Sequence, residues 1–171
     1  MKKFALTVLA AVSTLAATVP VAHAAVGSNT FNVTATLTSA CTVGTFSGPL
    51  SFGTVIAFVA PANPTAVTST ITCTRNLTGV TAGFDTTGVV ATGAGQSATP
   101  TGAGLLDNGL FYTISGAFGA ATAGTAASVS AVGTGDTRTF TVNGAMGAQA
   151  GTCIGATCIA TPQVRTLTLN Y

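Results

Sequence analysis

Short stretches along the chain alternate between apolar and polar residues. A two-residue period is typical of β-strands that turn one face to a core and the other to solvent. The clearest stretch lies near the N-terminus, where the apolar positions are Phe31, Val33, Ala35 and Leu37. The alternating and apolar runs together predict strands at residues 30–38, 41–46, 50–59, 67–74, 80–86, 110–115, 137–143 and 163–171.

The segments between these runs are rich in turn-forming residues. Asp107, Asn108 and Gly109 form a turn signal before the run at 110–115. Residues 90–104 and 116–135 consist mostly of Gly, Ala, Ser and Thr without a period, and we expect loops there. No long segment has the period of a helix, so the pattern indicates an all-β protein.

Regular short strands joined by turn-rich segments are typical of an immunoglobulin-like β-sandwich. One predicted strand stands alone near the N-terminus, however, and another ends at Tyr171 with Leu167 and Leu169 on the same face. A sandwich whose last strand is missing exposes a hydrophobic groove and an open sheet edge. The expected fold is therefore all-β, an incomplete immunoglobulin-like β-sandwich lacking its last strand.

Residues 1–24 have the features of a secretory signal peptide. Lys2 and Lys3 precede an uncharged, mostly apolar run, and Ala22, His23 and Ala24 fit the small-x-small rule for cleavage. We expect cleavage after Ala24, export from the cytoplasm, and no membrane span in the mature chain.

Removal of this segment leaves very few charges. Three arginines and three aspartates remain, without lysine, glutamate or histidine, so the formal charge is zero. Nucleic-acid binding requires a basic surface, and a calcium site requires clustered carboxylates. We therefore expect no nucleic-acid partner and no cofactor. Hydrophobic residues make up 47% of the sequence, which argues against intrinsic disorder.

The same scarcity of ionisable side chains argues against catalysis. Without His, Lys or Glu, a serine or threonine nucleophile has no ordinary general base. Two of the aspartates Asp85, Asp107 and Asp136 could in principle form a glycosidase pair. All three lie in or beside predicted turns or Gly-rich loops, where we expect solvated side chains. The sequence therefore indicates that the protein is not an enzyme.

The mature chain contains four cysteines, at positions 41, 73, 153 and 158. An even number in an exported chain predicts two disulfides, for which three connectivities exist. A local pair of Cys153 with Cys158 is one option, and it leaves Cys41 to pair with Cys73. Zinc is the alternative partner, but only one cysteine pair is closely spaced and no histidine remains.

Several segments, taken in order, resemble the spore coat protein U-like domain, which occurs in major subunits of archaic chaperone–usher pili. They are FNVTATLTSACTV (31–43), LSFGTV (50–55), STITCTR (69–75), FTVNGAMGAQ (140–149) and RTLTLNY (165–171). The resemblance covers essentially the whole mature chain. Two features depart from it: the chain has no tryptophan, and a Cys153–Cys158 pair is not expected of every member.

The resemblance implies a structural protein that assembles by donor-strand complementation. Residues 25–39 would form an N-terminal donor strand, and residues 40–171 an immunoglobulin-like pilin domain. The donor strand would fill the groove of a neighbouring subunit, giving a homopolymer, after handling by a periplasmic chaperone and an outer-membrane usher. The implied product is a surface pilus for adhesion and biofilm formation. The implied site residues are the donors Phe31, Val33, Ala35 and Leu37, the groove residues Leu167, Leu169 and Tyr171, and a Cys41–Cys73 disulfide.

Three alternatives remain open. The segment 31–37 could be the first strand of a complete monomeric sandwich that acts as a secreted adhesin or lectin-like module. A spore-coat-type matrix protein could use the same strand exchange without forming a long pilus. Threonines at every second position, as in Thr34, Thr36 and Thr38, could bind ice or a sugar, although outward strand positions favour threonine in any case.

Overall fold

The computed structural model describes residues 29–85 and 96–171. The predicted signal peptide lies outside this part. The chain divides into two compact units, Met1–Thr36 and Leu37–Tyr171. In the described part of the first unit no strand forms, and the side chains of Phe31 and Val33 are 86% and 84% exposed. The strand predicted at 30–38 is therefore absent from the single chain, as expected of a terminal strand without a ladder partner.

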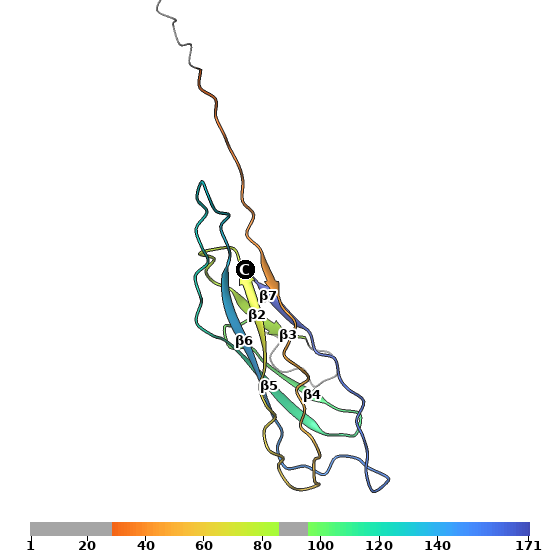
Figure 1. Cartoon of the computed structure of the whole chain (residues 1–171). Helices are drawn as coiled ribbons and strands as arrows, with labels where there is room; N and C mark the ends of the chain where they lie inside the picture. Colours follow the sequence, from red (N-terminus) through yellow and green to blue (C-terminus); the bar gives the residue numbers. More distant parts are fainter. Residues whose placement is uncertain (1–28, 86–95) are drawn as a thin grey trace, which may run out of the picture. The chain divides into compact units, whose positions relative to one another are not determined.

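The described residues of the second unit form seven strands in two antiparallel sheets (Figure 1). The larger sheet is curled and has the order β1-β2-β6-β5-β4, and the smaller one pairs β3 with β7. The strands are β1 (Cys41–Val43), β2 (Val67–Cys73), β3 (Thr81–Phe84), β4 (Thr101–Leu105), β5 (Phe111–Phe118), β6 (Asp136–Ala145) and β7 (Leu167–Asn170). The predicted all-β class is thus confirmed for the described residues.

No helix occurs in residues 29–85 and 96–171, so this part offers none with the length and apolar character needed to cross a bilayer.

Strand alternation decides which side chains form the core. In β2, Val67, Ile71 and Cys73 are buried, whereas the threonines between them are turned to the other face of the sheet. Phe140 of β6 is fully buried and makes an edge-to-face contact with Phe118, with ring centroids 4.8 Å apart. Phe140 also meets Phe84 of β3 at 6.4 Å. The aromatic contacts therefore join the two sheets through one core.

β4 lies in a segment that the sequence predicts as a loop. Residues 90–95 of that segment are outside the described part, but residues 101–105 form a regular strand against β5. Gly102 and Gly104 occupy its inward positions, so no apolar side chain marks the strand. A Cβ atom at Gly104 would overlap the ring of Tyr112, and one at Gly102 would crowd Ile114 and Phe84. Side chains of neighbouring strands thus fill the space that the glycines leave.

The strand predicted at residues 50–59 is wrong. Leu50, Phe52 and Val55 pack against the core, but from an irregular segment without ladder partners in the described part of the chain. Phe58 has a φ of 68°, in the left-handed region that a continuous strand does not use. The first apolar residues of this run therefore cover the core as a loop, whereas Ile56, Phe58 and Val59 are exposed.

Two disulfides are present, Cys41–Cys73 and Cys153–Cys158. Cys41 lies directly opposite Cys73 in the β1–β2 register, with Cα atoms 4.0 Å apart. This bond fastens the three-residue edge strand β1 to its neighbour β2 in the larger sheet. Because disulfides persist mainly in oxidising compartments, both bonds indicate an extracytoplasmic location.

We predict that the two disulfides contribute unequally to stability. Replacing Cys41 and Cys73 together with alanine should lower the free energy of unfolding by about 3–4 kcal/mol, because this bond closes the longer loop. Replacing Cys153 and Cys158 should lower it by about 2 kcal/mol. Urea unfolding of the full chain and both double variants measures the difference. A larger loss from the Cys153–Cys158 pair would contradict this account.

Candidate functional site

The outer edge of β7 is unpaired. The N–H of Asp85 donates to the carbonyl oxygen of Thr166 at 3.0 Å. In an antiparallel pair the backbone hydrogen bonds recur at every second residue, so on β7 the next residues bonded to β3 are Thr168 and Asn170. Leu167 and Leu169 fall at the intervening positions, and their N–H and C=O groups point away from β3. Within the described part of Leu37–Tyr171, no strand pairs with that edge.

Among the described residues, nothing pairs with the outer edge of β1 either. The N–H of Gly44 donates to the carbonyl oxygen of Thr70 at 2.8 Å, which sets the alternation of ladder bonds between β1 and β2. Cys41 and Val43 fall at the intervening positions, so their backbone groups point away from β2. β1 is the last strand on its side of the larger sheet.

Both open edges border the same hydrophobic core. Cys41 of β1 and Leu167 and Leu169 of β7 pack against the buried cluster that contains Ile71. Val43 lies opposite Ile71 and therefore faces inward, yet its side chain is 41% exposed. An inward side chain with this exposure marks a core that the described strands do not fully cover. Such an arrangement is able to accept a further strand by ladder hydrogen bonds and apolar contacts.

A hydrogen-bonded arginine holds the segment that leads into β7. The Nε of Arg165 donates to Asp85 Oδ1 at 2.6 Å, and its Nη2 donates to the Asp85 carbonyl at 2.7 Å. Its Nη1 donates to the carbonyl of Ala103 at 2.8 Å and to the hydroxyl of Tyr112 at 3.0 Å. The Tyr112 hydroxyl in turn donates to Oε1 of Gln163. These bonds join the start of β7 to the end of β3 and to β4 and β5.

Arg165 remains charged in this environment. The side chains of Arg165 and Asp85 are only 13% and 17% exposed. Burial acts to lower the pKa of Arg165, but its hydrogen bonds with Tyr112 and Asp85 outweigh burial and raise the pKa above its ordinary value. A guanidinium that keeps its proton and has acceptors on all sides positions strands and does not exchange protons with a substrate.

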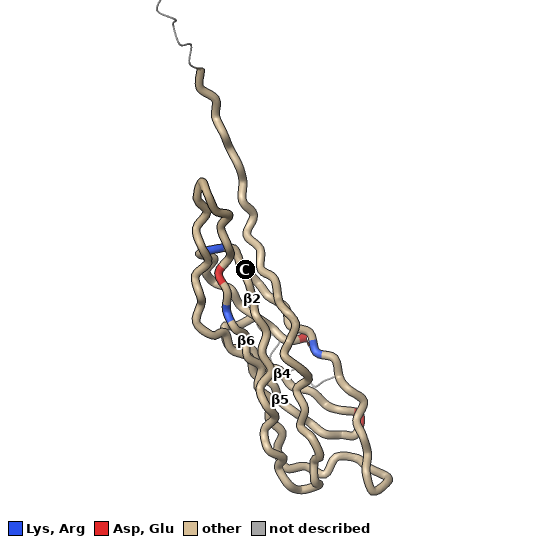
Figure 2. The backbone as a smooth tube through the Cα atoms, viewed as in Figure 1, with Lys and Arg blue, Asp and Glu red and all other residues tan. Residues whose placement is uncertain are grey.

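The other two aspartates anchor loops. Asp136 accepts hydrogen bonds from the N–H of Gly124 at 2.7 Å and of Asn76 at 2.8 Å, and these bonds lower its pKa. Hydrogen bonds from the side chain and backbone of Thr161 lower the pKa of Asp107. Figure 2 shows how few charged positions the chain carries. The described residues contain no group of three or more potential metal ligands.

The predicted donor residues are exposed. Phe31, Val33 and Ala35 belong to the first unit, whereas Leu37 is the first residue of the second and is 82% exposed. Their role as donors stays a prediction.

The predicted groove residues lie at the β7 edge. Leu167 and Leu169 are inward residues of β7, and Tyr171 follows the strand with its side chain half exposed. Sequence reasoning missed Val43 and Arg165. Arg165 lies two residues before Leu167 and therefore on the same inward face as the two leucines. This spacing could have identified Arg165 from the sequence. Val43 could be recognised only once β1 had been paired with β2.

We predict that Arg165→Gln destabilises the domain by about 2–3 kcal/mol, because Asp85 and Tyr112 lose a charged partner in a largely buried place. Arg138→Gln is the matched control, since Arg138 acts on Asp136 through its charge. That control should change the free energy of unfolding by less than about 0.5 kcal/mol. Urea unfolding measures both, and equal losses would refute a special role for Arg165.

Residues 28–156 match the Spore Coat Protein U domain, which is about three quarters of the chain and includes β1 to β6. No curated protein and no solved structure matches the chain. The matched family is structural or adhesive and is not a known enzyme family. The resemblance noted in the sequence is thereby confirmed, and the chain belongs to the Spore Coat Protein U domain family.

Proposed function

We propose that the protein is a secreted structural subunit that polymerises by donor-strand complementation into a surface pilus serving adhesion and biofilm formation. Residues 1–24 direct export, residues 25–39 form the donor extension, and residues 40–171 form an immunoglobulin-like pilin domain lacking its last strand. The observation that carries the proposal is the pair of unpaired edges, on β1 and β7, that border one incompletely covered core.

The N-terminal segment has the chemistry that this core requires. Phe31, Val33, Ala35 and Leu37 recur with the two-residue period of a strand that turns one face inward. Burial of Phe31, Val33 and Leu37 in a neighbour would contribute about 1.5–3 kcal/mol each, with less from Ala35. The unpaired backbone groups of Leu167 and Leu169 would supply ladder bonds to the incoming strand. Both halves of the interaction are therefore encoded in one chain.

The joint between the segment and the domain favours donation to another copy. Ala40 is bound to Thr74, since the N–H of Thr74 donates to its carbonyl at 2.8 Å. Only Thr38 and Ser39 separate Leu37 from this anchored residue. A two-residue hairpin at that point would need the positive φ values that Gly and Asn supply, and neither residue is there. The segment is therefore poorly suited to fold back along β1.

Repeated donation in one direction makes a filament. The donor segment and the acceptor edges are different surfaces, so each contact is head-to-tail and need not close into a ring. An exported subunit with an open edge would aggregate if it were left alone. This supports a periplasmic chaperone that covers the edge and an outer-membrane usher at which the neighbouring subunit replaces it.

Material sheared from cells that carry the complete assembly system provides the test, run on a gel in SDS before and after boiling. The wild type should give a ladder that collapses to a monomer on boiling. Leu37→Asp should abolish the ladder, because it places a charge among apolar groups at a cost of several kcal/mol. Thr36→Asp, on the opposite face of the donor segment, is the matched control and should keep the ladder.

A single monomer band from wild type and Leu37→Asp alike, with both proteins folded, would refute polymerisation by this segment. The protein would then act as a monomeric secreted adhesin or lectin-like module. A ladder in surface material without extended fibres under the electron microscope would instead favour a coat or matrix protein that uses the same exchange.

A further inference from the structure

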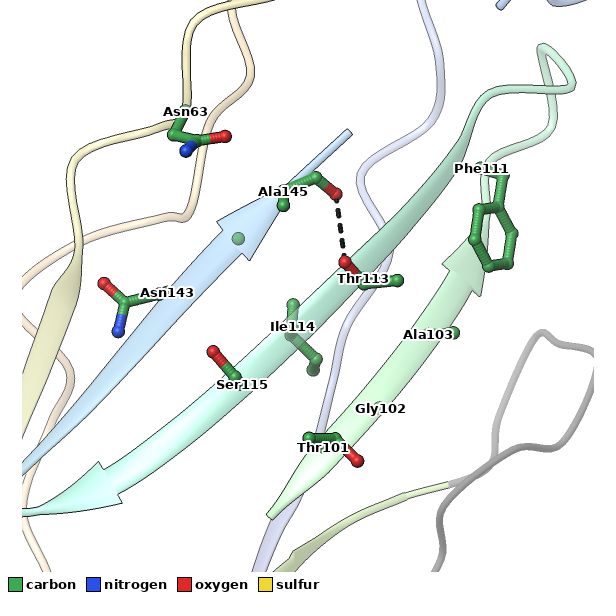
Figure 3. A pocket seen from close by; sticks show the side chains of 11 residues that line it. Asn63, Thr101, Gly102, Ala103, Phe111, Thr113, Ile114, Ser115, Asn143 and Ala145 are labelled. Atoms are coloured by element: carbon green, nitrogen blue, oxygen red, sulfur yellow. Dashed lines mark hydrogen bonds between the residues drawn. The ribbon is translucent and has the colours of Figure 1, made fainter. Parts of the chain in front are cut away.

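A pocket of about 520 Å³ lies on the outward face of the larger sheet, where β4, β5 and β6 run side by side (Figure 3). Asn63, from the segment before β2, forms its remaining wall. The strands β1 and β7 contribute no lining residue. The pocket is therefore separate from the two open edges and has its own chemistry.

Strand register explains why the sheet is hollow at this point. Asn143, Ser115 and Thr101 lie opposite one another and form a polar row across β6, β5 and β4. The next row on the same face is built from small side chains: Ala145, Thr113 and Ala103. Phe111 faces Leu105 in the row beyond. Small residues between a polar row and an aromatic row leave a depression about 13 Å long, the span of four strand residues.

The polar groups of the pocket are available to a ligand. The side chains of Asn63, Thr101, Ser115 and Asn143 are not engaged in hydrogen bonds with other described residues, whereas the Thr113 hydroxyl makes a long 3.4 Å bond to the Ala145 carbonyl. Amides and hydroxyls both donate and accept hydrogen bonds. Figure 3 shows Asn143, Ser115 and Thr101 in succession across the three strands, with Asn63 beyond β6.

The lining also restricts what the ligand can be. None of the lining residues is charged, so a phosphate, carboxylate or ammonium group would find no ion-pair partner. At the far end the ring of Phe111 is 41% exposed and offers an apolar surface beside Ala103 and Ala145. A ligand that fits must be uncharged, elongated, rich in hydroxyl groups and able to place C–H groups against an aromatic ring. A neutral oligosaccharide has all four properties.

We propose that this pocket is a binding site for neutral oligosaccharides, with Asn63, Asn143, Ser115 and Thr101 bonding hydroxyl groups and Phe111 stacking against a sugar ring. Such binding needs only the residues that line the pocket. One consequence rests on the proposed function: since β1 and β7 do not line the pocket, each subunit of a filament would display one open site. Weak sites repeated along a fibre bind a polysaccharide with an avidity far above the single-site affinity.

The test is an NMR titration of the isotopically labelled full chain with uncharged trisaccharides, namely cellotriose, maltotriose, mannotriose and the fully N-acetylated chitotriose. At least one should shift the amide resonances of residues 101–103, 111–115 and 143–145 saturably. Asn143→Ala should weaken binding about tenfold, through loss of its hydrogen bonds. Ala145→Phe should abolish binding by filling the hollow. Thr139→Val, on the same face of β6 but outside the pocket, is the matched control and should bind as the wild type does.

Three results would overturn the site: no shift of these amides by any of the four sugars at millimolar concentration, shifts confined to residues outside the pocket, or equal binding by Asn143→Ala and the wild type. Sialyllactose and glucose 6-phosphate complete the titration, and preferential binding of either would contradict the requirement for an uncharged ligand. The titration needs no polymer, so a negative titration would refute the pocket without bearing on polymerisation. Loss of the SDS-resistant ladder would likewise refute polymerisation without bearing on the pocket.

Discussion

Unpaired backbone groups at the outer edge of β7 are the feature on which the account of this protein depends. The N–H and C=O groups of Leu167 and Leu169 point away from β3, while the leucine side chains pack on the core. An edge of this kind invites pairing with another chain. The edge of β1, with the inward but exposed Val43, has the same character. Two such edges on one core are a liability in a monomer, and under the proposed function they would receive a strand from a neighbouring subunit.

The rest of the domain holds these edges in place. The Cys41–Cys73 disulfide fixes a strand of only three residues to the neighbouring strand β2. The guanidinium of Arg165 reaches Asp85, Ala103 and Tyr112, and so fixes the approach to β7. A strand-accepting site must be rigid before the strand arrives, because each residue ordered on binding reduces the affinity. One covalent bond and one buried ion pair provide that rigidity at the two edges.

The strands with clear alternation could be predicted from the sequence, and the others could not. The threonine and apolar alternation of 67–73 and 136–145 reflects one buried and one exposed face, which the structure confirms. β4 was not predicted because its inward positions are the glycines 102 and 104, which leave space for side chains of other strands. Only the three-dimensional packing reveals this relation. The strand predicted at 50–59 was wrong because a loop that covers a core can be as apolar as a strand. Leu167 and Leu169 were recognisable by spacing and resemblance. The contacts of Arg165 and the pocket over β4, β5 and β6 depend on the pairing of strands that are distant in the sequence, which the sequence alone does not reveal.

Hydrogen exchange at β7 tests the central claim most directly. Amide exchange of the full chain would be followed with and without a synthetic peptide of residues 29–39. The account predicts that the amides of Leu167 and Leu169 exchange rapidly in the chain alone and become protected with the peptide. Those of Thr168 and Asn170, which face β3, should be protected in both samples. Leu167 and Leu169 amides that are already protected in the chain alone, or that remain unprotected at saturating peptide, would contradict an open acceptor edge on β7.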